Sequence, residues 1–309
     1  MQGLLIGIAN AITGMRSGIA SAAATIFAAY KARVIADGGV VENDACTIAF
    51  LESIGAGTDI IPLFDADAQA FFDRVTAASG SLNTTEQDAV NTLVVQMKAD
   101  GIWDSMKAIY PMVGASAAAC SQNLKSSSFT GSFSSGWTFA STGVKPNGTS
   151  ATFDTSYNPL TQGLNVNSNH HSFYLRTNNV TLNAVDGGQI DNKWLSAVYF
   201  TDKIYIYNPS NTYIITVPST SSNSLSINTR RSSTDFAFFK NNVKMGTSTT
   251  ANVQSFASTN LHFASAGGTT FWSPRENAFG SIGDGLNDTQ AAQLYTAVQA
   301  FQTTLSRQV

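Results

Sequence analysis

Charged side chains are scarce in this chain of 309 residues, because Asp, Glu, Lys and Arg make up 12% of it. An average globular protein has about twice that share. The 17 basic residues are outnumbered by 20 acidic ones, which gives a formal net charge of −3. Such a balance leaves no basic surface to neutralise a phosphate backbone, so we expect no nucleic-acid partner. Ser, Thr, Asn and Gly supply the polar surface instead, as in proteins that work outside cells or in large assemblies.

Cysteine and histidine are also rare. The two cysteines, Cys46 and Cys120, have no metal-ligand spacing and are too few for a disulfide framework, so we expect buried free thiols. Of the three histidines, His170 and His171 are adjacent and should point to opposite faces of a strand. At most one of this pair could serve a site, and we expect the other ring to pack inward.

No unbroken apolar run is long enough to cross a membrane. Residues 1–36 are rich in Gly, Ala and Ile, but Asn10, Thr13 and Arg16 divide the apolar stretch into pieces of about ten residues, whereas a span needs about 20. A secretory signal would begin with basic residues, which are missing. An interfacial membrane helix is the weaker alternative, because such helices carry Lys and Arg on their polar face. We expect residues 1–36 to be an anchoring and oligomerisation segment that packs against protein.

A helical region is expected at residues 37–120. Its first clear helix begins at Asp65 as the N-cap and ends before Gly80, with Phe71 and Phe72 on the buried face. We expect these aromatic rings to be core residues rather than part of a ligand site.

The next helix has a stronger start signal. Thr85 and Asp88 have the spacing of a capping box, and Asp100-Gly101 ends the segment. One apolar stripe runs along it, formed by Val90, Leu93, Val94 and Met97.

Residues 121–309 have a different pattern, in which Ser, Thr, Asn and Gly separate short aromatic or β-branched runs. In "KIYIYN", Ile204 and Ile206 alternate with tyrosines, as in a half-buried strand. "KPNGT" is a turn, and "FAFFKNNVKMGTST" is a hairpin that turns at Asn241-Asn242. The other expected strands are "HSFYLRT", "WLSAVYF", "YIITVPS", "SLSINTRR", "LHFASAG" and "NAFGSIG". Many short strands without helices between them indicate an antiparallel sandwich.

One helix closes the chain. Asn287 or Asp288 can cap it, and its apolar residues recur three and four positions apart. They are Ala291, Leu294, Val298, Phe301 and Leu305. This helix, at residues 287–305, should lie on an apolar surface of the sandwich.

The last strand and helix resemble the end of concanavalin A-like lectin and glucanase domains, also described as laminin G-like or jelly-roll domains. In these, a strand with a small-residue step is followed by an acid-capped helix with a Leu-Tyr pair. The matching residues are Ile282, Gly283, Gly285, Leu286, Asp288, Ala292, Leu294 and Tyr295. The resemblance, added to the periodicity, implies an α+β fold: a helical N-terminal region, then an antiparallel β-sandwich of jelly-roll type closed by a C-terminal helix.

The wider layout of residues 60–309 is similar to bacteriophage and prophage virion structural proteins of tail-fibre or spike type. It combines the helical block "TTEQDAVNTLVVQMKADGIWDSMKAIYPMVG" with "WTFASTGVKPNGTSATFDT", "HHSFYLRTNN" and a close on "AVQAFQTTLSRQV". The resemblance implies an exposed place on the virion, host-surface attachment through a lectin-like domain and a homo-oligomer, with a trimer favoured. Other virion proteins would be held through residues 1–36. The alternative is a capsid-lattice or decoration component without receptor binding.

Enzymatic activity is not expected. The glucanase relatives of this fold use two carboxylates on neighbouring positions of one strand. None of the acids between residues 126 and 285 has such a partner two positions away: Asp154, Asp186, Asp191, Asp202, Asp235, Glu276 and Asp284. No serine has the surroundings of a nucleophile elbow. We therefore expect no cofactor and no catalytic residue.

A metal site is conceivable at "VDGGQIDNKW", where Asp186, Asp191 and Asn192 lie near turns and could bind Ca²⁺ through oxygen atoms. The spacing is not that of an EF-hand, so no metal ion is expected.

A carbohydrate ligand would need aromatic faces for stacking and polar side chains for its hydroxyl groups. The aromatic residues nearest expected turns, with their polar neighbours, are Trp137, Tyr157, Asn192, Trp194, Trp272 and Arg275. They are the candidate ligand-binding residues from sequence. The alternative for each tryptophan is a core or interface anchor.

Overall fold

The computed structural model describes residues 64–309, except for 181–182, 191–193, 195, 197, 201–202, 209–213, 219–220 and 253. The expected anchoring segment at residues 1–36 and Cys46 lie outside the described residues. Asp65–Val309 form one compact unit.

The first two helices begin at well-formed caps. α4 spans Ala66–Ala77, with the predicted N-cap Asp65 accepting from the amide of Asp67. α5 spans Thr84–Ala99 and ends at Asp100 as predicted, but its capping box consists of Asn83 and Glu86. The predicted pair of Thr85 and Asp88 is therefore wrong. A capping box places Glu or Gln three residues after the cap, and Asn83 is the residue with Glu86 at that distance.

A strand follows where only helix was expected. After a short 3₁₀ turn, η1 (Trp103–Ser105), the chain extends as β1 (Met106–Tyr110), which pairs antiparallel with the last strand of the chain. A one-turn helix, α6 (Ala117–Cys120), comes next. The prediction of a helical region through residue 120 is thus wrong at 106–110, and this segment belongs to the sandwich.

The largest sheet has eight antiparallel strands in the order β13-β12-β11-β6-β15-β4-β3, with β1 also paired to β15. Its strands are β3 (Trp137–Ala140), β4 (Gly143–Pro146), β6 (Asn169–Leu175), β11 (Ser224–Ser232), β12 (Asp235–Lys240), β13 (Val243–Ser248) and β15 (Asn277–Gly283). The β12–β13 hairpin turns at Asn241 and Asn242 as predicted, both with positive φ (46° and 63°). Asn tolerates this left-handed conformation better than most residues.

Two smaller antiparallel sheets complete the described strands. One has the order β2-β5-β14-β7 and is made of β2 (Ser132–Phe133), β5 (Phe153–Asp154), β14 (His262–Phe263) and β7 (Gly187–Gly188). The other has the order β10-β9-β8 and is made of β8 (Val198–Phe200), β9 (Lys203–Ile206) and β10 (Ile215–Pro218). Ile204 and Ile206 are buried as predicted and pack in one apolar cluster with Phe236 and Phe238 of β12.

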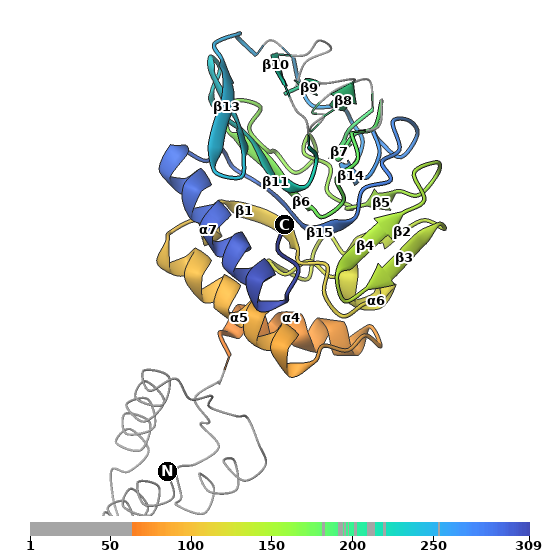
Figure 1. The fold of residues 1–309 in the computed structure, drawn as a ribbon. Coiled ribbons are helices and arrows are strands. Elements are labelled where there is room, and N and C mark those ends of the chain that lie inside the picture. The colour runs from red at the N-terminus through yellow and green to blue at the C-terminus, as the bar shows by residue number, and fades with distance from the viewer. Residues whose placement is uncertain are drawn as a thin grey trace, which may run out of the picture. The chain divides into compact units, whose positions relative to one another are not determined.

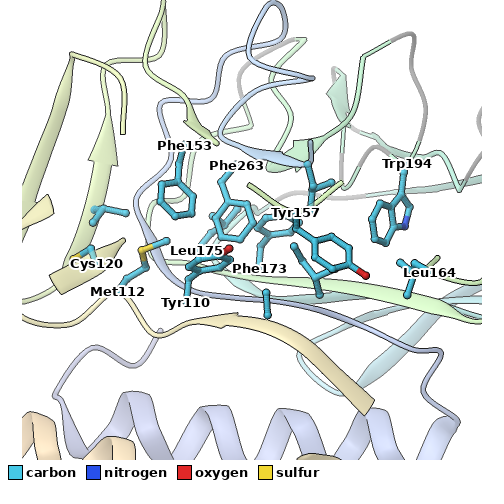
Figure 2. Packing of buried hydrophobic residues seen from close by; sticks show 14 of the residues in the cluster. Tyr110, Met112, Cys120, Phe153, Tyr157, Leu164, Phe173, Leu175, Trp194 and Phe263 are labelled. Carbon is cyan, nitrogen blue, oxygen red and sulfur yellow. The ribbon is translucent and has the colours of Figure 1, made fainter. Parts of the chain in front are cut away.

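The main core lies between the eight-stranded sheet and the four-stranded sheet (Figure 2). Tyr110 of β1 packs edge-on against Phe153 of β5 and Phe263 of β14, at centroid distances of 5.0 and 5.5 Å. Phe173 of β6, in the large sheet, packs against the Phe263 ring with a centroid distance of 4.8 Å. Aromatic rings from both sheets therefore interlock, as expected for a sandwich.

The last helix, α7 (Asp288–Thr304), covers the other face of the large sheet and lies beside α5 (Figure 1). Asn287 caps it in a box with Gln290. Phe301 packs against Phe279 of β15, and the Gln302 side chain donates to the Ala278 carbonyl. The predicted C-terminal helix is confirmed, and so is the predicted fold class: α+β, with an antiparallel sandwich closed by this helix.

The end of the chain is fixed by a buried arginine. Arg307 is 1% exposed and donates to Gln302 Oε1 and to the carbonyl oxygens of Pro111, Met112 and Ala278. Burial lowers its pKa to about 10. These bonds join the residues after β1, strand β15 and the last turn of α7.

Both adjacent histidines are buried, on opposite faces of β6. His170 lies on the helix-covered face, with Nδ1 2.5 Å from the Asp284 carbonyl oxygen and Nε2 3.2 Å from Ser281 Oγ. His171 lies on the inner face, where its ring meets Trp194 at 4.8 Å and Asn228 Nδ2 lies 2.7 Å from its Nε2. From the sequence we expected one of the two rings to pack inward. In the structure both rings are buried, because helices cover the outer face of the sheet as well.

Cys120 is a buried free thiol, as predicted, and burial raises its pKa to about 12. Within the described part of the chain, no helix has the length and apolar character of a membrane span.

Candidate ligand-binding site

The four-stranded sheet has a polar outer face. Phe153 and Phe263 point into the core, so their neighbours Asp154 and His262 project from the opposite face. Asp154 lies directly across from His262 in the antiparallel pair β5–β14, and Ser132 of β2 lies on its other side. One row across the sheet thus places a hydroxyl group, a carboxylate and an imidazole next to one another.

The Asp154 carboxylate is held in one orientation but stays accessible. Asn260 Nδ2 donates to both of its oxygens, at 3.0 and 3.2 Å, and the Ser156 amide donates to Oδ1 at 2.8 Å. The side chain keeps 34% exposure, and Oδ2 lies 3.7 Å from His262 Nε2. Oδ2 therefore has lone-pair capacity left on the side that faces the imidazole.

The His262 ring is oriented by the backbone. Its Nδ1 lies 3.2 Å from the Asn260 carbonyl oxygen, which can only accept, so we assign the proton of the neutral ring to Nδ1 and the lone pair to Nε2. Burial lowers the pKa of His262, and the Asp154 charge and the Asn260 carbonyl act in the opposite direction. The ring is thus mainly neutral at pH 7. Two acceptors, Nε2 and Asp154 Oδ2, then face each other with no donor between them.

Two hydroxyl groups lie at the edge of this pair. Thr152 Oγ1 and Ser265 Oγ are 2.7 Å apart, and the Gly268 amide donates to Ser265 Oγ at 3.2 Å. Ser265 is buried, whereas Thr152 is partly exposed. A Cβ atom at Gly268 would lie 3.1 Å from His262 Nε2 and 3.7 Å from Thr152 Oγ1. The glycine therefore keeps the space over these two polar atoms open, and we define Thr152, Asp154, Asn260, His262 and Ser265 as the Asp154 site.

Of the six candidates from sequence, Trp137 lies next to this site. Its indole Nε1 donates to the Thr152 carbonyl at 3.1 Å. The partly buried ring packs edge-on against Phe133 at 5.1 Å and against the main core, so it does not face Asp154. Trp272 is also partly buried and belongs to the segment after β14, where the next residue, Ser273, donates its amide to the Ala264 carbonyl.

Three other candidates are core residues. Tyr157 is 2% exposed, and Trp194 and Arg275 are completely buried. Tyr157 and Trp194 belong to the main apolar cluster (Figure 2). Their assignment to a surface ligand site is therefore wrong, because side chains shielded from solvent have no free face for a ligand. Asn192 lies outside the described residues.

Asp186, which was considered as a Ca²⁺ ligand, forms an ion pair with Arg275 instead. Arg275 Nε and Nη2 contact Asp186 Oδ1 at 2.8 and 2.5 Å, with both side chains fully buried. This oxygen is therefore already neutralised by a cation, while Asp191 and Asn192 lie outside the described residues. Among the residues that the structure describes, no three His, Cys, Asp or Glu side chains come together as a metal site.

A shallow groove of about 440 Å³ lies between the start of α5 and the end of α7. Its lining is Asn83, Thr84, Thr85, Glu86, Ser141, Thr304, Leu305 and Ser306. The Glu86 carboxylate there is already used by the Asn83 and Gly114 amides, and Asn83 by the helix cap. These groups serve the local fold, so the Asp154 site is the stronger candidate.

The sequence matches no family model and no curated protein. Solved structures with a similar fold include domain 4 of AbnA, a GH43 extracellular arabinanase from Geobacillus stearothermophilus, in complex with arabinotriose. It is 14% identical at a TM-score of 0.46, and the match covers 62% of this chain and 98% of that domain.

Botulinum neurotoxin binding domains form a second group of similar structures. The DC binding domain in complex with rat synaptotagmin II is 12% identical at a TM-score of 0.42, with 64% of this chain and 52% of that chain covered. The same domain in complex with SialylT is 11% identical at a TM-score of 0.40, with the same coverage. This chain thus spans about half the length of the toxin domains. At these identities and TM-scores, the likeness carries no information on what this chain binds.

The residues of the Asp154 site were missed as a group from sequence. Asp154 was considered only as a possible catalytic acid, and Asn260 is 106 positions away from it. The alternation in "ATFDT" and "NLHFAS" does place Asp154 and His262 on the face opposite the buried phenylalanines. Only the strand register, which the sequence does not contain, makes them neighbours.

Proposed function

We propose that this chain is a non-enzymatic virion structural protein of spike or tail-fibre type, whose sandwich binds a host-surface carbohydrate through the Asp154 site. The observation that carries the ligand proposal is the pair of oriented, partly exposed acceptors, Asp154 Oδ2 and His262 Nε2, 3.7 Å apart. A hydroxyl group of a ligand can donate to one of these two acceptors and accept from Thr152. Carbohydrates present several such hydroxyl groups on a rigid ring.

The same geometry argues against catalysis at this site. The Asp154 site contains one carboxylate, whereas glycoside hydrolysis generally uses two. A serine nucleophile would need a histidine bonded to it through one ring nitrogen and to a carboxylate through the other. In His262, Nδ1 meets a backbone carbonyl and Nε2 faces the carboxylate, so no ring nitrogen is directed to a serine.

The virion assignment rests on the low charge and on the resemblance of residues 60–309 to phage structural proteins. In this proposal, residues 1–36 hold the chain in a homo-oligomer, a trimer in the favoured case, and contact other virion proteins. The sandwich then faces outward, because loops on a rigid scaffold are where recognition is usually carried.

Binding of the full-length chain to an array of bacterial envelope polysaccharides and defined oligosaccharides tests this proposal. We expect binding that Asp154→Ala weakens at least tenfold and that Asp73→Asn leaves unchanged. Asp73 is the matched control, because it is an exposed carboxylate on α4 whose side chain accepts from Gln69. A chain that binds no glycan and does not slow adsorption of the virus, yet assembles with virion proteins, would favour the lattice or decoration component instead.

A further inference from the structure

The Asp154 site contains more acceptors than donors, and this imbalance bears on which sugars fit it. A carboxylate is an anionic acceptor at neutral pH, and His262 Nε2 carries a lone pair because Nδ1–H is directed to the Asn260 carbonyl. The Asn260 side-chain N–H groups are already turned toward Asp154. What remains open is one anionic and one neutral acceptor.

The donors near this pair are few, and the backbone amides among them are already bonded. The Gly268 amide is bonded to Ser265 Oγ, and Ser265 is paired with Thr152. The Ser156 amide is bonded to Asp154 Oδ1. The remaining donors are the partly exposed Thr152 hydroxyl and the exposed Ser132 hydroxyl on the other side of Asp154, and neither carries a charge.

From this arrangement we propose that the site selects neutral or amino sugars and excludes sugars that carry a carboxylate, sulfate or phosphate group at the contact position. The inference rests on the proposed carbohydrate function and specifies its ligand class. A hydroxyl group donates to one of these acceptors, and an ammonium group, which has three N–H donors, can donate to both. An anionic group of a ligand contains only hydrogen-bond acceptors, so it cannot bond to the two acceptors of the site. It would also lie beside the negative charge of Asp154, and like charges brought together in an interface weaken binding strongly. Lowering of the His262 pKa by burial supports the same view, because the ring adds no positive charge at pH 7.

Oligogalacturonate and the carboxyl-reduced form of the same oligomer are a suitable pair of probes, because they differ only in a carboxylate or a hydroxymethyl group. Isothermal titration of the full-length chain at pH 7 should give a Kd at least tenfold lower for the reduced oligomer. Chitosan oligomers, which carry ammonium groups, should bind at least as well as the reduced oligomer. Because sugars differ in shape as well as charge, a sugar that the array identifies as a ligand is tested in the same way beside its carboxyl-oxidised form.

Two variants connect the result to the site. Asp154→Asn keeps the side-chain size but removes the charge and adds a donor, so the preference for the neutral partner should fall from tenfold to about twofold or less. Gly268→Ala places a methyl group over His262 Nε2 and should weaken binding of every sugar at least tenfold. Gly268 has φ of +75°, which strains any other residue, so Gly163→Ala is the matched control: φ is +67° there, but a Cβ meets nothing within 4 Å.

The outcomes separate the two proposals. Preference for the neutral or amino partner, reduced in Asp154→Asn, supports the inference. Equal or tighter binding of the anionic partner overturns the inference and leaves the carbohydrate function in place. If no sugar of the array or of the probe set binds the folded chain, the proposed function itself is wrong, and the inference falls with it.

Discussion

Arg275 and Asp186 form an ion pair in which both side chains are completely shielded from solvent, with Nη2 2.5 Å from Oδ1. The guanidinium also donates to the carbonyl oxygens of Asn179 and Ala184. These bonds connect the residues just before β15 with the segment that leads into β7. A single side chain thus holds the large sheet and the small sheet in one arrangement.

Arg275→Met should destabilise the protein by about 3 to 5 kcal/mol, because it leaves the buried Asp186 carboxylate without its cation. Urea unfolding followed by fluorescence measures this free energy. Lys107→Met is the control: Lys107 and Asp284 form an ion pair with side chains 38% and 41% exposed, and its loss should cost at most about 1 kcal/mol. Equal losses in the two variants would show that the buried pair has no special structural role.

Stability should fall with acidification below about pH 6.5. Burial lowers the pKa of His170 to about 4 and that of His171 to about 3, and the nearby His170 lowers the pKa of His171 further. The unfolded chain, with ordinary histidine pKa values near 6.5, therefore binds protons first, so unfolding takes up protons between pH 6.5 and the folded pKa values. The stability due to neutral histidines is complete above pH 6.5 and is lost as pH falls through this window.

Comparison of His171→Asn with the unchanged chain tests this assignment. Proton uptake on unfolding near pH 5, obtained from the slope of the unfolding free energy against pH, should drop by about one proton per molecule. Asp186 changes the pH dependence of stability in the opposite sense, because burial raises its pKa to about 6. Its contribution cancels in this comparison, since both proteins contain it. An unchanged slope in His171→Asn would mean that another group takes up the proton.

A fragment of residues 65–309 should fold, and a fragment of residues 121–309 should not. The shorter fragment lacks β1 and with it Tyr110. The Tyr110 ring packs against Phe153 and Phe263, and its hydroxyl group donates to the carbonyl oxygens of Phe129 and Thr155. Circular dichroism and thermal unfolding distinguish the cases: a cooperative transition is expected only for 65–309. A cooperative transition of similar midpoint in 121–309 would contradict the structural role of β1.

Ligand binding should weaken as pH falls from 7 through the pKa of folded His262, which burial holds below its usual value of 6.5. Protonated His262 places an N–H between its ring and Asp154 Oδ2, which uses both acceptors of the site. Asp154 is the charged group facing the ring, from β5, while β7 contributes Gly188 and the segment after β14 contributes Gly268, neither of which titrates. His262→Gln cannot take up this proton, so its affinity, although lower, should change less than twofold over the same range. Titration calorimetry at several pH values measures both, and a wild-type Kd that does not rise as His262 becomes protonated would contradict this mechanism.

The helices and most strands followed from local patterns because their periodicity is strong. Asp65 and Asn287 have their predicted roles, and the apolar stripe of α7 is buried from Ala291 to Phe301. Its predicted last member, Leu305, is instead the half-buried C-cap. β1 was missed, since "MKAIY" is short and has no alternation: four of its five residues are buried, on both faces. Nothing local distinguishes such a segment from the end of the preceding helical region.

The site was harder to predict for a different reason. Aromatic residues near expected turns were chosen as ligand contacts, but such a side chain can also pack into the core, as Trp194 does against Phe256 at a centroid distance of 4.9 Å. Two glycines of the "IGDGL" step also serve packing, since a Cβ at Gly283 or Gly285 would lie 2.1 Å from the carbonyl oxygen of Ser105 or Arg230. Tertiary contacts of this kind are set by register and chain path, which composition and spacing do not specify.

β15 is bonded to β6 along one edge and to β4 and β1 along the other, and it is the last strand of the chain. During translation, the strands β13-β12-β11-β6 and the strands β4-β3 therefore have no shared neighbour until residues 277–283 have left the ribosome. Until this strand is made, the large sheet stays in two parts with apolar surface exposed, a state prone to aggregation. A ribosome that stops before this strand releases two halves of a sheet with nothing to join them.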